Sequence, residues 1–272
     1  MNIQSTFLGI FVAFNAIILA SNAIAQNDQL DSDIKACDSG DNNSCYNLAN
    51  SYRYGEGVKQ DFETAVQLYA LACDGKHMDA CNSLGVRYAR GEGVEQDFKK
   101  AIQFYTIACN GNNMRACNSI GLRHDKGEGV KQDFVKAAMF YTRACNGNYM
   151  TACANLGRHS AKGKGVKQDY VKAAEFYTKA CNGGDMPACN LMGQLYQDGN
   201  GVEQNHTKAI QLFTKACNAN NNGACNNLGY SFENGLGVEK NKSKGKAWYK
   251  KTCDSGSKFG CKNYEALEKQ GV

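Results

Sequence analysis

Proline is almost absent from this sequence, with Pro187 as the only one among 272 residues. Because proline breaks helices, its scarcity permits long helical segments without internal interruptions. No run with the alternating pattern of a β-strand stands out either. The formal net charge of +5 is too small to mark a nucleic-acid-binding protein. These absences favour an all-α protein and exclude a strongly basic, nucleic-acid-binding class.

Charged side chains are missing from residues 1–25, where an apolar stretch extends from Phe7 to Ala20. This stretch is shorter than the roughly 20 apolar residues of a membrane span. It is followed by Ala23-Ile24-Ala25 and a polar start at Gln26, which predicts a secretory signal peptide over residues 1–25. An uncleaved anchor is the alternative, because no Lys or Arg precedes the apolar stretch. A secreted or periplasmic protein without a membrane segment after cleavage is therefore expected.

The cysteines follow a strict spacing. Fourteen cysteines form seven C-x7-C pairs, and each pair is followed by the next after 36 residues. The cysteines are Cys37, Cys45, Cys73, Cys81, Cys109, Cys117, Cys145, Cys153, Cys181, Cys189, Cys217, Cys225, Cys253 and Cys261. An even number of cysteines behind an export signal predicts disulfides. Structural zinc is the alternative, but it favours cysteines two to four residues apart.

The repeat restricts the pairing of these cysteines. Stacked helical repeats lie roughly 10 Å or more apart, whereas the Cα atoms of a disulfide lie within about 7 Å. We therefore expect each disulfide to form within its own C-x7-C pair. No metal and no cofactor is predicted.

Each 36-residue repeat predicts two helices. The first helix follows the second cysteine of a pair, as in Leu48, Ala49 and Tyr52, and ends at a G-x-G-V sequence such as 55–58. The second helix begins after an Asp or Asn suited to capping, such as Asp61. Its aromatic residues are predicted to form the core of the repeats. The glycines end helices here and do not form a nucleotide loop, because no strand precedes them.

This pattern of Leu-Gly, Tyr, G-x-G-V, Asp, Ala and aromatic-Tyr resembles the Sel-one-like repeat, a relative of the tetratricopeptide repeat. With C-x7-C in each unit, residues 37–270 are similar to the Helicobacter cysteine-rich protein family. The resemblance implies an α/α superhelical solenoid of helical hairpins with one disulfide per repeat. Residues 26–272 would form one repeat domain of six full repeats, with capping helices over 27–38 and 260–270. We expect a monomer.

Basic residues recur in the first helices of three successive repeats, in columns expected outside the core. In two of these repeats a polar residue also replaces the core aromatic residue. The set is Arg87, Arg90, Arg123, His124, Lys126, His159, Ser160 and Lys162. Because arginine binds carboxylates through two parallel hydrogen bonds, we predict a cleft for a carboxylate-bearing ligand. A solvated helix face with two tolerated polar substitutions is the alternative.

We expect a module that binds peptides, peptidoglycan fragments, penicillin-like ligands or envelope and host proteins. The family resemblance also implies penicillin binding and weak β-lactamase activity. However, S-x-x-K occurs only at 32–35, 243–246 and 255–258, S-D-N is absent, and the nearest match to K-T-G is Lys251-Thr252-Cys253. The four histidines show no zinc β-lactamase pattern, so no catalytic residue is assigned. A purely structural adaptor is the third alternative.

Overall fold

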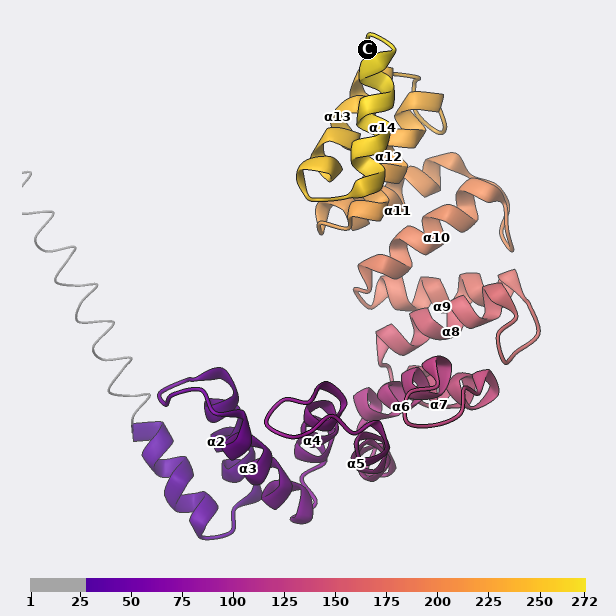
Figure 1. Ribbon diagram of the computed structural model, residues 1–272. Helices are drawn as coiled ribbons and strands as arrows, with labels where there is room; N and C mark the ends of the chain where they lie inside the picture. Colours follow the sequence, from indigo (N-terminus) through magenta and orange to yellow (C-terminus); the bar gives the residue numbers. More distant parts are fainter. Residues whose placement is uncertain (1–27) are drawn as a thin grey trace, which may run out of the picture. The chain divides into compact units, whose positions relative to one another are not determined.

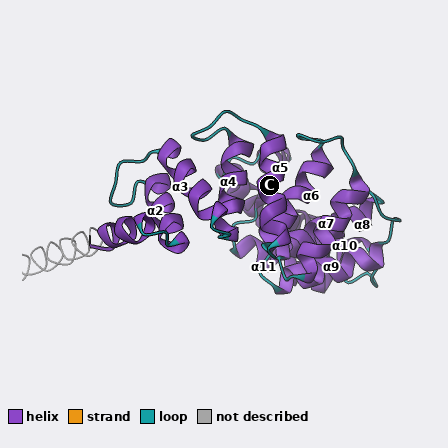
Figure 2. Ribbon diagram, turned by 90° about the horizontal axis from the view of Figure 1, so that it is seen from below, coloured by secondary structure: helices purple, strands orange, loops and turns teal. Residues whose placement is uncertain are grey.

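The computed structural model describes residues 28–272, and every regular element in this range is a helix (Figure 2). Residues 28–38 are helical and precede the repeats, as the sequence predicts. The remaining helices are α2 (Asn42–Tyr54), α3 (Phe62–Asp74), α4 (Met78–Arg90), α5 (Phe98–Asn110), α6 (Met114–Lys126), α7 (Phe134–Asn146), α8 (Met150–Lys162), α9 (Tyr170–Asn182), α10 (Met186–Asp198), α11 (His206–Asn218), α12 (Asn222–Asn234), α13 (Lys242–Asp254) and α14 (Lys258–Lys269) (Figure 1). The even-numbered helices are the predicted first helices, and the odd-numbered helices from α3 onward are the second. The predicted signal peptide, residues 1–25, lies outside the described residues.

The first helices end where the G-x-G-V sequences predict. In α8, the Gly163 cap has a φ of 64° and donates its backbone N–H to His159 O. This left-handed conformation favours glycine, because a Cβ would be strained there. The other caps with the same geometry are Gly55, Gly91, Gly127, Gly199 and Gly235. Local backbone chemistry thus fixes the ends of these helices.

The second helices begin at the predicted Asp or Asn caps. In α9, a carboxylate oxygen of Asp169 accepts the backbone N–H of Lys172 at 2.9 Å. Equivalent caps are Asp61, Asp97, Asp133, Asn205 and Asn241. Each cap satisfies an N–H that the helix itself leaves unpaired.

Glycine allows the two helices of a repeat to approach each other closely. A Cβ at Gly157 would lie 2.7 Å from the ring of Tyr177, which is 3% exposed. The same arrangement recurs in the pairs Gly85 with Tyr105, Gly193 with Phe213 and Gly229 with Tyr249. The predicted aromatic core is confirmed for the buried column of Tyr69, Tyr105, Tyr141, Tyr177, Phe213 and Tyr249, whereas the residues that precede them, such as Phe104, are only partly buried.

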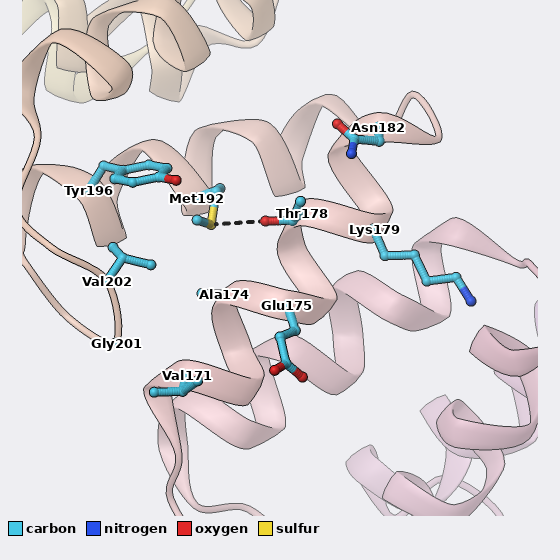
Figure 3. A pocket seen from close by; sticks show the side chains of 10 residues that line it. All are labelled: Val171, Ala174, Glu175, Thr178, Lys179, Asn182, Met192, Tyr196, Gly201 and Val202. Atoms are coloured by element: carbon cyan, nitrogen blue, oxygen red, sulfur yellow. Dashed lines mark hydrogen bonds between the residues drawn. The ribbon is translucent and has the colours of Figure 1, made fainter.

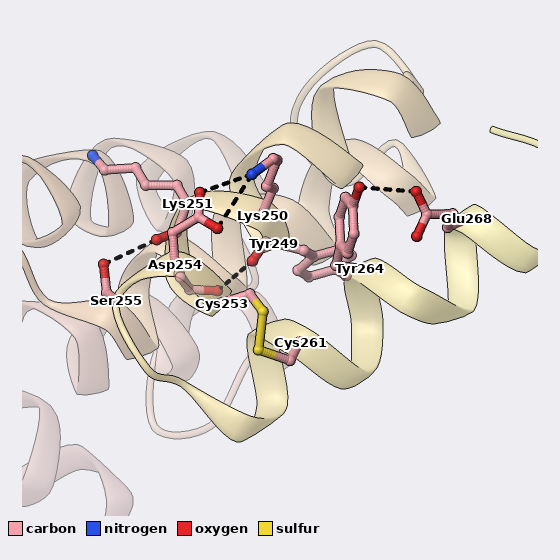
Figure 4. A network of polar contacts seen from close by, with 10 residues as sticks. Tyr249, Lys250, Lys251, Cys253, Asp254, Ser255, Cys261, Tyr264 and Glu268 are labelled. Atoms are coloured by element: carbon pink, nitrogen blue, oxygen red, sulfur yellow. Dashed lines mark hydrogen bonds and ion pairs between the residues drawn. A yellow bond between two sulfur atoms is a disulfide. The ribbon is translucent and has the colours of Figure 1, made fainter.

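Each predicted disulfide is formed within its own C-x7-C pair. The Cα atoms of paired cysteines lie 4.4–4.8 Å apart, and no cysteine is free. Figure 4 shows the last disulfide, which joins the end of α13 to the start of α14. The zinc alternative is thereby excluded for these residues, and each second helix is joined covalently to the first helix of the next repeat.

The chain forms two compact units. Among the described residues, one contains 28–123 and 127–131, and the other contains 124–126 and 132–272. We refer to them as the first and second units. No helix within residues 28–272 is both long and apolar enough to cross a membrane.

Polar contacts join neighbouring repeats inside the second unit. Lys179 Nζ donates to Cys145 O at 2.9 Å, and Lys215 Nζ donates to Cys181 O at 3.2 Å. Both lysines thereby place a positive charge at the carboxyl end of a preceding second helix, where the helix dipole favours it. The first helices are also joined, since the Asn227 amide donates to Asn190 Oδ1 at 2.8 Å.

Candidate functional site

The column of basic residues formed by Arg87, Arg123 and His159 is more deeply buried than the sequence indicates. Arg87 is 1% exposed and His159 is 3% exposed, so their placement on a helix face outside the core is wrong. Both side chains are covered by the loop that follows their own helix. Only the neighbouring column, with Arg90, Lys126 and Lys162, is exposed. Arg87 and His159 therefore hold in place the loops that follow α4 and α8.

The two arginines of this column already contact carboxylates of their own repeats. Arg87 forms an ion pair with Glu92, whose other carboxylate oxygen lies 3.5 Å from Arg90. Burial lowers the pKa of the Arg87 guanidinium, and the adjacent Glu92 opposes that shift. Arg123 pairs with Glu128 in the same way. The carboxylate site stays a prediction, in which a ligand would have to exchange with Glu92 or Glu128.

The two histidines of the predicted site lie in the second unit and contact other residues there. His124 stacks on Phe140 at a ring distance of 5.9 Å, and burial lowers the pKa of its imidazole. In His159, Nδ1 lies 2.9 Å from Lys164 O and Nε2 lies 3.2 Å from Asp125 Oδ1. Ser160 is 3% exposed. His124 therefore continues the aromatic column, and the His159 ring lies between the Lys164 carbonyl and the Asp125 carboxylate.

The sequence resembling K-T-G has a structural role. Thr252 is fully buried and donates its hydroxyl to Tyr249 O at 2.9 Å, while Cys253 is in a disulfide. Ser255 Oγ donates to Lys251 O at 2.9 Å (Figure 4). These groups stabilise the end of α13.

An open groove in the second unit lies between α9 and α11, with α10 as its floor. It consists of two adjoining cavities of about 490 and 340 Å³ that share Thr178, Asn182, Met192 and Tyr196. Figure 3 shows the larger cavity, which extends from Val171 near the start of α9 toward Thr178. We call this feature the α9–α11 groove.

The groove combines an apolar floor with polar walls. Met192 and Tyr196 form the floor, and the Thr178 hydroxyl lies 3.6 Å from the Met192 sulfur (Figure 3). Lys208 Nζ lies 5.2 Å from the centre of the Tyr196 ring, within cation–π distance. Gln211 lies on the α11 side. An apolar floor with a few polar groups is typical of ligand-binding sites.

Tyr196 occupies the same column as Tyr52, in the apolar stripe that the repeat pattern predicts for each first helix, so the groove was not predicted. The signal that could have located it is Leu212, which lines the groove in a column that holds leucine also in the first repeat, as Leu68, and an aromatic residue in the other four repeats. In those repeats a ring fills the space, as where Phe104 stacks on Tyr88 at 5.4 Å. A leucine is smaller than a phenylalanine and leaves part of that space open.

Comparison with known protein families shows which repeat this is. The protein-family model described as "Sel1 repeat" matches residues 42–77, 79–113, 115–149, 151–185, 187–221 and 223–257. These six segments together cover well over half of the chain. No curated protein matches the sequence.

Solved structures show the same helical repeat. A protective antigen of uropathogenic Escherichia coli, c5321, has 26% identity and a TM-score of 0.82 over 89% of this chain, but this chain covers only 52% of that protein. A Sel1 repeat protein from Oxalobacter formigenes has 28% identity and a TM-score of 0.75, covering 80% of this chain and 89% of its own. Helicobacter pylori cysteine rich protein B has 33% identity, covers 49% of this chain and 96% of its own, and has a TM-score of 0.41.

Proposed function

Because the chain belongs to the Sel1 repeat family, we propose that it is an interaction module that holds a polypeptide segment in the α9–α11 groove. Repeat proteins of this kind present extended surfaces to their partners. The observation that carries the proposal is the groove itself, with its apolar floor at Met192 and Tyr196 and its polar rim.

The length of the groove favours a peptide over a small ligand. Its wall on α9 extends from Val171 to Asn182. At 1.5 Å per residue, this part of a helix is about 16 Å long. An extended peptide rises roughly 3.3 Å per residue, so about five residues would lie along it. A β-lactam or a single sugar would fill only part of this length.

The polar rim suits a peptide backbone. Asn182 and Gln211 line the groove from opposite sides, and their amides can both donate to carbonyls and accept N–H groups. The apolar floor between them would take one peptide side chain. Lys179 and Lys215 reach past the groove to backbone carbonyls of the preceding repeats, so they hold its walls in position.

The disulfides indicate an oxidising compartment outside the cytoplasm, because such bonds rarely persist in the cytoplasm. We therefore expect export directed by residues 1–25 and a partner that is also extracytoplasmic. Determination of the mature N-terminus tests the export step. A protein that begins at Gln26 supports cleavage, and one that retains residues 1–25 contradicts it.

A direct test is selection of peptides from a random display library on the oxidised protein, followed by binding to two variants. Thr178→Arg would fill the groove, because Thr178 lines both cavities. Thr106→Arg is the matched control, since Thr106 is exposed at the equivalent position of α5. Peptides that lose affinity for Thr178→Arg only would support the proposal.

Two outcomes would contradict the peptide proposal. One is the recovery of peptides that bind both variants equally well. The other is that no peptide is recovered, whereas labelled muropeptides or benzylpenicillin bind the unchanged protein and do not bind Thr178→Arg. The second outcome would assign the groove to cell-wall ligands instead.

A further inference from the structure

Positive charge is concentrated in one part of the second unit. Residues 133–175 contain seven lysines and arginines but only three acidic residues, Asp133, Asp169 and Glu175, in a chain whose net charge is +5. The basic residues are Lys136, Arg143, Arg158, Lys162, Lys164, Lys167 and Lys172. The rest of the chain is therefore close to electrical balance.

Exposed apolar side chains are concentrated in the same part. On α7, Val135 is 66% exposed and Met139 is 57% exposed, and on α9, Val171 is 57% exposed. Val135 and Val171 occupy the same position in consecutive repeats. The other repeats hold polar residues there, namely Glu63, Lys99, Thr207 and Ser243. Large apolar groups facing water in this pattern mark an interaction surface.

The repeat geometry brings the charged and apolar groups together at the amino ends of these helices. Lys164, in the loop after α8, has its Nζ 4.6 Å from the centre of the Phe134 ring. The same loop packs against the start of α7, where a Cβ at Gly165 would collide with the Phe134 carbonyl. Lys164 therefore lies beside the start of α7, where Val135 directly follows Phe134.

The loop itself departs from the other repeats in charge. Lys164 occupies the position that holds Glu56, Glu92 and Glu128 in the first three repeats. Lys164 and Lys167 are both exposed. Lys136 and Lys172 add two further cations in the first turns of α7 and α9, and Lys136 lies 3.9 Å from its own cap, Asp133. We call Val135, Lys136, Met139, Lys164, Lys167, Val171 and Lys172 the basic–apolar edge.

The basic–apolar edge joins the α9–α11 groove at Val171, which belongs to both. We propose that this edge makes the groove selective for an acidic polypeptide segment that carries large apolar side chains. Carboxylates of the segment would pair with the lysines, and its apolar groups would cover Val135, Met139 and Val171. The inference rests on the proposed function and specifies the chemistry of the partner.

A concave groove distinguishes this surface from one that binds lipid. An anionic bilayer also attracts lysines and exposed apolar side chains. However, the apolar residues here continue from Val171 into a cavity of about 490 Å³ floored by Met192 and Tyr196. A side chain of a polypeptide can occupy this open groove, and an acidic segment also supplies the carboxylates that would pair with the lysines.

The experiment is selection of random nine-residue peptides on the full oxidised protein, with sequencing of those that Thr178→Arg no longer binds. We expect this pool to be enriched in Asp and Glu together with Leu, Ile, Phe or Trp. One enriched peptide, fluorescently labelled, is then titrated against two charge variants. Lys164→Glu with Lys167→Glu should weaken binding about tenfold at low salt, and the loss should shrink in high salt.

The matched control reverses the same amount of charge elsewhere. Lys59→Glu with Lys99→Glu changes two exposed lysines of the first unit and should leave affinity within about twofold. Val171→Thr, which introduces the residue that the later repeat holds as Thr207, tests the apolar contribution without altering a buried position. It should weaken binding severalfold in both low and high salt.

Three results would overturn the inference. A pool that depends on the groove but is neutral or basic would contradict the acidic partner and leave the proposed function standing. Equal losses for the two charge pairs would show a general effect of net charge. The third result has two parts: the protein sediments with phosphatidylglycerol vesicles unless Lys164→Glu and Lys167→Glu are introduced, and the selection yields no acidic peptides. It would assign the basic–apolar edge to lipid. Failure to select any groove-dependent peptide would instead count against the proposed function itself.

Discussion

Replacing Cys181 and Cys189 with alanine should show how strongly one disulfide couples two repeats. This bond joins the end of α9 to the start of α10, which form the wall and the floor of the α9–α11 groove. The two cysteines are eight residues apart, and closing a loop of this size is worth about 2.5 kcal/mol in the chain-entropy model. Both side chains are at most 2% exposed, so loss of the buried sulfur atoms adds roughly 1 kcal/mol. We expect a total loss of about 3–4 kcal/mol.

The matched control is the last disulfide, Cys253–Cys261, which closes a loop of the same length. Its cysteines are only partly buried, and only α14 follows it within the described residues. In a repeat array each unit depends on its neighbours, so a break at the end frays one helix, whereas an internal break weakens the repeats on both sides. Replacing Cys253 and Cys261 should therefore cost less than replacing Cys181 and Cys189.

The assay is urea denaturation under non-reducing conditions, monitored by far-ultraviolet circular dichroism. Mass mapping first confirms that the other disulfides of each variant are intact. The internal variant should unfold at a lower urea concentration and over a broader range than the terminal one. Equal midpoints for the two variants, or an internal loss below about 0.5 kcal/mol, would refute the view that these bonds couple neighbouring repeats.

Three further predictions follow from individual contacts. Gly157→Ala would place a Cβ 2.7 Å from the Tyr177 ring and should lower the free energy of unfolding in urea by about 1–3 kcal/mol. Ala49→Gly, at the same position of the first repeat, should lower it by about 1 kcal/mol or less. Burial raises the pKa of Tyr177 from 10.0 to about 12. Because the unfolded phenol ionises first, the contribution of Tyr177 to stability should be constant below pH 10 and should be lost as the pH rises toward 12. Tyrosinate absorbance and denaturation of Tyr177→Phe check this, and an unchanged pH dependence in that variant would contradict it. Asp169→Ala removes the acceptor of the Lys172 N–H and should cost about 1 kcal/mol by thermal denaturation, while Asp169→Asn should be nearly neutral.

The ends of the helices and the pairing of the cysteines were predictable because both depend on local chemistry. Gly163 ends α8 since its left-handed conformation suits a residue without a Cβ. Asp169 begins α9 since its carboxylate accepts an N–H three residues later. Cys181 can reach Cys189 because the turn between two helices brings them within 4.6 Å. In each case the interacting groups are close together in the sequence.

The candidate sites depended on contacts that only the folded chain makes. The sequence places Arg87 and His159 on the first helices, but whether water reaches them depends on how the following loop packs over the helix, and the loop buries both. The α9–α11 groove depends on the space between helices of successive repeats, which changes when Leu212 replaces an aromatic ring. Helical periodicity assigns a side chain to one side of its own helix. The packing of the neighbouring helices and loops decides whether that side is filled, covered or open.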